Sequence, residues 1–90
     1  MSLRSGEAAR RTRTVFEAVV ALVGEGATHF RPGDIATHLR DAEHPIGAWE
    51  IRGEFTKLER MELIEVDPEL AVWHLVDGAS FSIEEARKLA

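Results

Sequence analysis

One predicted helix carries most of the side chains in this chain that are suited to contact a charged or aromatic partner. At about 100° per residue, the apolar positions of segment 48–61 share one face: Ile51, Phe55 and Leu58. The opposite face carries cations, a hydroxyl group and an aromatic ring but no carboxylate: Trp49, Gly53, Thr56, Lys57 and Arg60. Glu54 and Glu59 lie on the flanks, near the apolar face. The outward face is therefore suited to hydrogen bonding and ion pairing.

No residues have the spacing of an enzyme active site or a metal centre. The four histidines share no ligand spacing and no His-Glu-x-x-His motif: His29, His38, His44 and His74. The adjacent Glu84 and Glu85 fit the start of a helix better than an acid/base pair. The chain has no cysteine, which excludes disulfides, thiolate catalysis and cysteine-based metal sites. We expect no enzyme activity, no metal and no cofactor.

The length and composition indicate one globular domain over residues 1–90. A chain of 90 residues with 44% hydrophobic residues can form a single core, although it buries only about 60% of its unfolded surface. No apolar run approaches the roughly 20 residues of a membrane span, and the N-terminus lacks the apolar segment of a signal peptide. We expect a cytoplasmic protein without membrane contact, in which residues 1–4 are disordered or derive from cloning.

Charge is distributed unevenly along the chain. The net charge of −5 argues against nucleic-acid binding, because Lys and Arg supply most of the non-specific affinity for phosphates. Four arginines nevertheless stand near the N-terminus with Glu7 as the only acid among them: Arg4, Arg10, Arg11 and Arg13. Acids gather further along the chain: Glu62, Glu65, Asp67 and Glu69. We therefore expect an electrostatically polarised molecule.

The first predicted helix has more apolar surface than one buried face requires. It starts near Ser5 as N-cap and ends at Gly24 or Gly26. Its main stripe faces the core: Ala9, Thr12, Phe16, Val19, Val20 and Val23. A second line runs beside that stripe: Ala8, Val15, Ala18 and Leu22. Either the C-terminal helix or a second subunit is expected to cover this second line.

Turn, capping and periodicity signals divide the rest of the chain. Pro32 suits the first position of a helix, and Ser82 with Glu85 forms a capping-box pattern behind the staple residue Phe81. The connection over 41–47 is longer than a tight helix-turn-helix turn. The predicted elements are a short extended segment at 27–30, helices over 32–42 and 48–61, strands over 63–67 and 71–76 joined at 68–69, and a helix from 83 to the end.

The segment LERMELIEVDPELAVWHL, Leu58–Leu75, resembles the end of the recognition helix and the wing in the winged helix-turn-helix domain of bacterial transcriptional regulators. In both, a Leu-Glu pair, a short gap and Leu-Ile precede a hairpin. The resemblance covers Arg10–Leu75, and its first half is also loosely similar to the DNA-binding domain of ferric-uptake-type regulators, through Arg10–Thr14 and Phe30. It implies an α+β fold: a winged helix-turn-helix with a three-helix core, a small antiparallel β-hairpin wing and a short C-terminal helix.

The resemblance further implies a dimeric transcriptional regulator that reads double-stranded DNA with the third helix. The residues that it would bring to bases and phosphates are Trp49, Arg52, Thr56, Lys57 and Arg60. Arginines at the start of the first helix would contact phosphates: Arg10, Arg11 and Arg13. The alternatives are a solvated helix face, with Trp49 folded over Pro45 and Ile46, and a solvated, frayed N-terminus.

The hairpin tip departs from the DNA-binding pattern of such regulators, which usually carry Arg or Lys there. Asp67 and Glu69 would be repelled by phosphates, so this tip is not expected to enter a groove of DNA. It could face a protein instead, with Leu70 and Trp73 as contacts, although Trp73 also suits the core. The alternative function is therefore a protein-interaction module that uses either the acidic hairpin or the surface of the first and last helices. A homodimer is also expected to form through these two helices.

Overall fold

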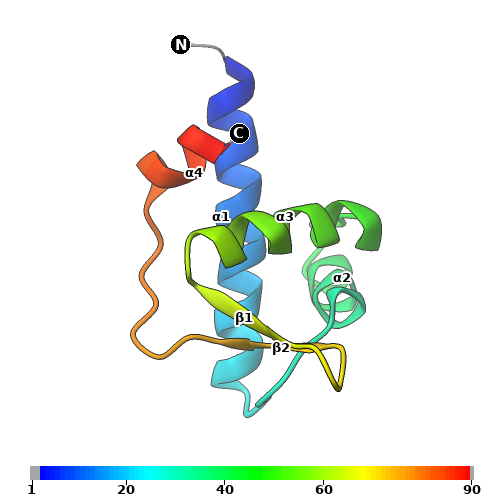
Figure 1. Ribbon diagram of the computed structural model, residues 1–90. Helices are drawn as coiled ribbons and strands as arrows, with labels where there is room; N and C mark the ends of the chain where they lie inside the picture. Colours follow the sequence, from blue (N-terminus) through cyan, green and yellow to red (C-terminus); the bar gives the residue numbers. More distant parts are fainter. Residues whose placement is uncertain (1–2, 90) are drawn as a thin grey trace.

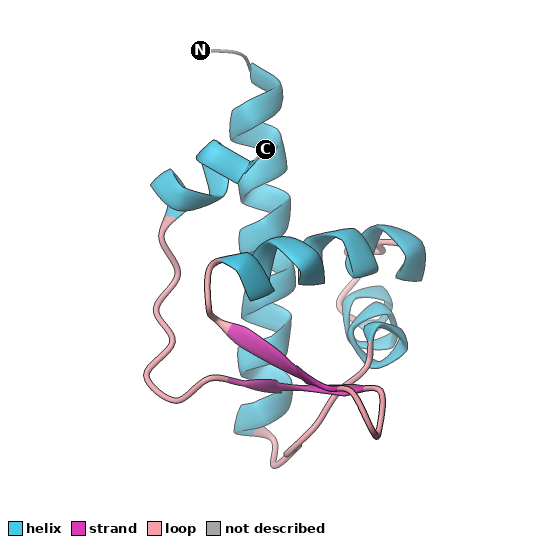
Figure 2. Cartoon of the chain, viewed as in Figure 1, coloured by secondary structure: helices cyan, strands magenta, loops and turns pink. Residues whose placement is uncertain are grey.

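The computed structural model describes the backbone of residues 3–89 and the side chains of residues 6–89. Its elements, in chain order, are α1 (Leu3–Gly24), α2 (Pro32–Asp41), α3 (Ala48–Arg60), β1 (Ile64–Asp67), β2 (Val72–Leu75) and α4 (Ile83–Leu89) (Figures 1 and 2). Within residues 3–89 the predicted α+β class is confirmed, with four helices and an antiparallel two-stranded hairpin. None of the helices in the described part of the chain is long and apolar enough to cross a membrane.

Helix α1 begins at Leu3, two residues before the predicted N-cap at Ser5. The prediction of the N-cap is wrong because nothing in Leu3 or Arg4 stops a helix, and Ser5 is accommodated inside the first turn. The expectation of a disordered or cloning-derived start concerned residues 1–4, of which 1 and 2 lie outside the described residues.

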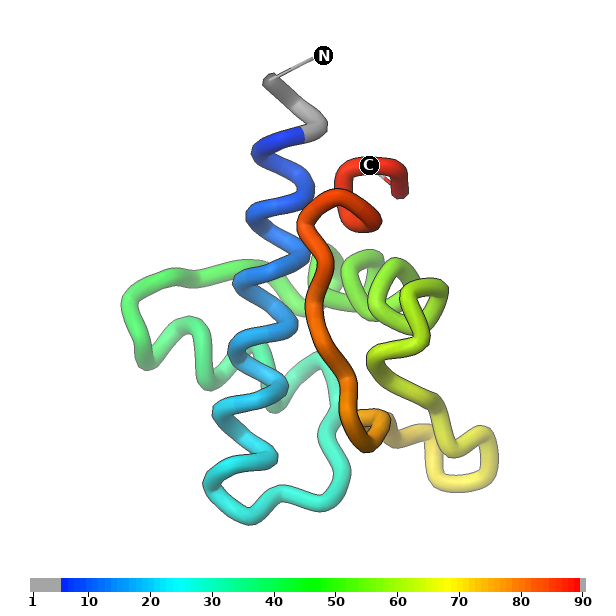
Figure 3. The backbone as a smooth tube through the Cα atoms, turned by 90° about the vertical axis from the view of Figure 1, so that its left-hand side faces the viewer, coloured from blue at the N-terminus to red at the C-terminus, as the bar shows by residue number. Residues whose placement is uncertain are grey.

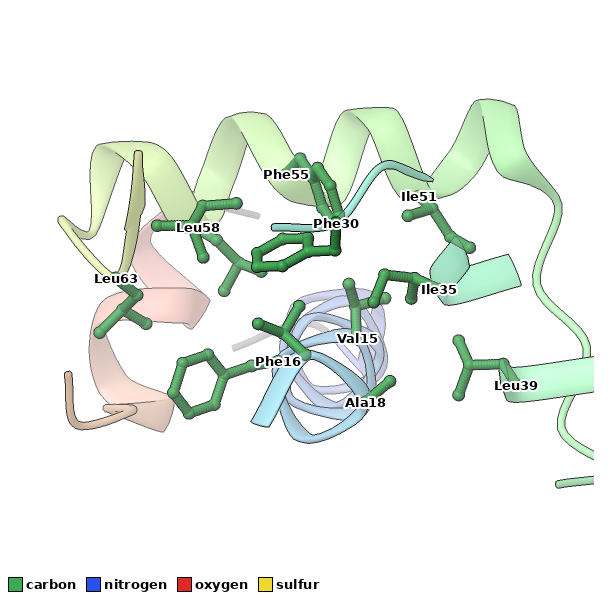
Figure 4. Packing of buried hydrophobic residues seen from close by; sticks show 12 residues of the cluster. Val15, Phe16, Ala18, Phe30, Ile35, Leu39, Ile51, Phe55, Leu58 and Leu63 are labelled. Carbon is green, nitrogen blue, oxygen red and sulfur yellow. The ribbon is translucent and has the colours of Figure 1, made fainter. Parts of the chain in front are cut away.

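The long helix α1 is the element on which all the others pack. Helices α2 and α3 and the hairpin surround its C-terminal part, whereas α4 lies beside its N-terminal half in both views (Figures 1 and 3). The buried core sits between α1, α2, α3 and β1 (Figure 4). Ile51, Phe55 and Leu58, the predicted buried face of α3, are fully buried.

The middle of the second apolar line of α1 is covered by α2. Val15 and Ala18 belong to the main core, and Figure 4 shows Ala18 turned toward α2, where Leu39 lies. Helix α4 covers the other side of α1, where Phe81 stacks on Phe16 with ring centroids 5.7 Å apart. The expectation that α4 covers this line is therefore wrong for Val15 and Ala18, because a helical wheel shows which side is apolar but not which neighbour reaches it.

The hairpin is tied to the helices through an aromatic cluster. Phe55 meets Phe30 and Trp73 edge to face, with centroids 5.6 and 5.3 Å away. Phe30 and Trp73 also form an isolated antiparallel bridge, in which each N–H donates to the other's carbonyl at 2.9 Å. The predicted extended segment at 27–30 is thus reduced to one bridging residue, and the placement of Trp73 against the core is confirmed.

Two helix ends and the hairpin use left-handed backbone at residues other than glycine. Glu62 follows α3 with φ +62°, and the next N–H, from Leu63, donates to the Leu58 carbonyl at 3.0 Å. Glu43 ends α2 in the same way with φ +60°, and Ala71 in the hairpin has φ +56°. Side chains with a Cβ are strained in this region, so these sites lower the stability of the fold.

Replacement of Glu62 by glycine should stabilise the protein. Glu62→Gly relieves the left-handed strain and keeps the hydrogen bond that ends α3, so we expect the free energy of unfolding to rise by about 1 kcal/mol in urea denaturation. The matched control is Glu59→Gly, which removes the same charge inside the helix and should destabilise by roughly 0.5–1 kcal/mol. Equal effects at both positions would contradict the assignment of strain to Glu62.

Candidate functional site

The outward row of α3 is exposed, as the helical pattern predicts. Trp49, Thr56 and Arg60 all lie on the surface, and Gly53 leaves a gap between them. Trp49 is 80% exposed, which contradicts the alternative in which its ring folds over Pro45 and Ile46. No carboxylate shares this row, but Glu62 and Glu85 line the same hollow as Arg60 at its C-terminal end.

Arg52 lies on the flank of α3 that faces the hairpin. Its guanidinium carbon is 5.7 Å from the centroid of the Trp49 ring, which is within the range of a cation–π contact. Within residues 6–89 the Arg52 side chain forms no ion pair. The hydroxyl of Thr56 donates to the Arg52 carbonyl at 3.3 Å, so in this conformation its proton is directed to the backbone and not outward. The exposed group of this flank is the guanidinium.

A groove of about 640 Å³ lies beside Arg52, between the start of α2, the N-terminal half of α3 and β2. Its cations are Arg31 and Arg52, and its apolar walls include Trp49, Ala71 and Trp73. No acidic residue lines it. In a chain with a net charge of −5, this groove is a local surface that favours an anionic group with an apolar part.

A buried carboxylate on the opposite flank was missed in the sequence. Glu54, expected on the flank of α3, is only 1% exposed. Its Oε1 accepts the hydroxyl of Thr12 at 2.5 Å. Its Oε2 accepts the Nε–H of Arg11 at 3.0 Å and lies 3.5 Å from Nζ of Lys57. We call these four residues the Glu54 cluster; it joins α3 to α1 by charge-assisted bonds.

The Glu54 cluster reduces the positive charge that two of the predicted cations offer to a partner. The side chains of Arg11 and Lys57 are 45% and 22% exposed, and both are directed at one oxygen of Glu54. The two cations and one carboxylate leave one positive charge for a partner. Sequence signals for this cluster existed: Glu54 is three residues from Ile51 and four from Leu58, and Thr12 is the polar member of the apolar stripe on α1.

The N-terminal arginines do not form one patch. Arg11 turns toward α3, whereas Arg10 and Arg13 are exposed and helical geometry directs them to other sides of α1. The structure therefore brings Trp49, Arg52 and Thr56 together on α3 and places Lys57 with Arg11 at the α1 junction. Arg60 lies apart at the end of α3, next to α4, and Arg10 and Arg13 lie apart on α1.

Comparisons with protein-family models, with curated proteins and with solved structures found no match. The function is consequently argued from the geometry of these side chains.

Removal of the Glu54 charge should destabilise the fold. Glu54→Gln keeps the size of the side chain but weakens its bonds to Thr12 and Arg11, so we expect the free energy of unfolding to fall by about 2 kcal/mol. Urea denaturation measures this change. The control Glu59→Gln removes an exposed charge from the same helix and should stay within about 0.5 kcal/mol of the wild type. Equal losses in the two variants would refute the role of the cluster.

Proposed function

We propose that this chain is a small winged-helix DNA-binding protein that regulates transcription and reads duplex DNA with α3. The order of three helices, hairpin and short helix supports the winged-helix assignment, as does the bridge between Phe30 and Trp73, which adds a third extended segment next to the hairpin. The observation that carries the proposal is the exposed outward side of α3, where the row of Trp49, Thr56 and Arg60 holds no carboxylate and Arg52 lies exposed on the adjoining flank.

In this proposal α3 enters the major groove with its outward row. Arg52 and Arg60 hydrogen-bond to guanine edges or phosphates, since a guanidinium matches either geometry. Trp49 is exposed enough to contact a thymine methyl group, and Gly53 allows a close approach. Thr56 serves as a further hydrogen-bonding group once its hydroxyl turns from the backbone.

The second set of contacts is to phosphates along α1. Arg11 donates its Nε–H to Glu54, which leaves its terminal nitrogens for a phosphate, and Lys57 lies at the same carboxylate oxygen. Arg10 and Arg13 are exposed and, in this proposal, contact phosphates of a neighbouring DNA strand. A homodimer formed through α1 and α4 remains part of the proposal, because dimers place two reading helices on successive turns of DNA.

Loss of two arginines from α3 should weaken DNA binding. We expect the Arg52→Ala, Arg60→Ala double variant to bind mixed duplex DNA at least about tenfold less tightly, and the slope of log affinity against log salt to fall by about 2. Fluorescence anisotropy at two salt concentrations measures both quantities.

The matched control removes the same charge from another surface. Arg40→Ala with Arg87→Ala changes two exposed cations, one near the end of α2 and one on α4, and its affinity for DNA should stay close to that of the wild type. An equal loss in both double variants would indicate only a dependence on net charge. No binding by the wild type at low salt would refute the proposal.

The acidic hairpin should oppose DNA binding. Glu69 is exposed at the tip, so Glu69→Lys replaces a repulsive charge by an attractive one and should tighten binding a few-fold at low salt. Asp67 is left unchanged because its Oδ1 accepts the N–H groups of Glu69 and Leu70 and holds the turn. The control Glu84→Lys makes the same charge change on α4. Weaker binding by Glu69→Lys would contradict this placement of the hairpin.

A second candidate function is protein binding through the hairpin. Leu70 is 59% exposed beside Glu69, and Val66 on the same hairpin is 38% exposed. An acidic surface with exposed apolar side chains suits a cationic protein surface better than it suits DNA.

A further inference from the structure

The groove between α2, α3 and β2 has a feature that DNA binding does not use. Its cations, Arg31 and Arg52, suit a phosphate, but much of its wall is apolar, with Ala71 and Trp73 on one side and Trp49 at the edge. A phosphate backbone has no apolar group to place there. An acidic peptide segment with an apolar side chain matches both parts of the lining.

The hairpin tip of the same chain has that chemistry. The tip presents Glu69 and Leu70 on the surface, and Leu70 is 59% exposed. Asp67 fixes the tip, because its carboxylate accepts two backbone N–H groups at 3.0 and 3.2 Å. No Lys or Arg occurs between Arg60 and Arg87. His74 is paired with Glu65 at 3.1 Å, whereas Glu69 at the tip forms no ion pair within residues 6–89. The tip is a preformed, acidic and apolar projection.

The tip and the groove are neighbours on one side of the molecule. Ala71 lines the groove and directly follows Leu70 in the chain. The turn stands out from the body of the protein, below α2 and α3 in Figure 1 and at the lower right in Figure 3. A surface patch that carries both a projecting tip and a groove complementary to that tip can pair with the same patch of a second copy about a two-fold axis.

We infer that two copies of this chain associate through this patch, each placing its tip, Pro68–Leu70, in the groove of the other. Leu70 meets the apolar wall beside Trp49, and Glu69 pairs with Arg52 of the second copy. The inference rests on the second candidate function, the hairpin as a protein-binding surface, and it names the partner. Since the patch includes the Trp49 and Arg52 side of α3, self-association and DNA binding compete for that surface.

The test is the oligomeric state of the full chain by sedimentation velocity, from micromolar to millimolar concentration. We expect the wild type to form a reversible dimer. Arg52→Glu and Glu69→Arg, each alone, place like charges opposite each other twice per dimer and should weaken association at least about tenfold. An equimolar mixture of the two variants restores both ion pairs, because each copy supplies the charge that the other needs, and should dimerise again.

The mixture separates lost pairing from lost folding, since misfolded variants would not recover. Arg87→Glu reverses an exposed charge on α4, where the DNA-binding proposal places a homodimer. It should leave the dimer formed by tip and groove unchanged, so this variant distinguishes the two interfaces. A wild type that stays monomeric overturns the inference, as does a mixture that stays monomeric or a dimer that only Arg87→Glu disrupts. Duplex binding, measured on the same variants in dilute solution, distinguishes this failure from failure of the DNA-binding proposal.

Discussion

The placement of α3 depends on the carboxylate of Glu54. A buried carboxylate is destabilising unless its lost hydration is replaced, and here Thr12 and Arg11 from α1 and Lys57 from α3 supply that replacement. Burial of the apolar face of Ile51, Phe55 and Leu58 sets which side of α3 points outward. The bonds to Glu54 are directional, and they add a polar restraint on the rotation of α3 against α1. The exposed row of Trp49, Thr56 and Arg60 is thus held in place by buried residues on the other sides of the same helix.

The cluster also shows how a chain with a net charge of −5 presents cationic surfaces. Glu54 neutralises charge at the α1 junction, whereas Arg52 and Arg31 lie in a groove with no acidic lining. The acids of the hairpin project from a different element. Because salt at physiological strength screens exposed charges over about 8 Å, local charge governs contacts more than the total does. Net charge alone therefore gives a poor account of which partner this molecule binds.

The elements of the fold could be predicted because their signals are local. Pro32, the Ser82 cap and the alternation of strand residues mark boundaries that lie within a few residues of the observed ones; the Glu85 N–H does donate to the Ser82 hydroxyl at 3.3 Å. The wrong predictions concern which elements pack against each other. Nothing local indicates that α2 covers Val15 and Ala18, or that Thr12 and Glu54, 42 residues apart, meet inside the protein. Polar residues on apolar faces, as at Thr12 and Glu54, are the sequence signal for such a pairing.

The two tryptophans lie in different surroundings, so their fluorescence reports on two separate events. Trp73 packs edge to face on Phe55 and belongs to the junction of hairpin and core, so its emission follows the integrity of the fold. Trp49 is 80% exposed on the outward row of α3, beside the Arg52 guanidinium, and is the ring that a small soluble quencher reaches first. A ligand that covers the outward row of α3 without entering the groove would shield Trp49 and leave Trp73, which lines the groove, unchanged. Intrinsic emission thus separates occupation of the surface from unfolding without any added label.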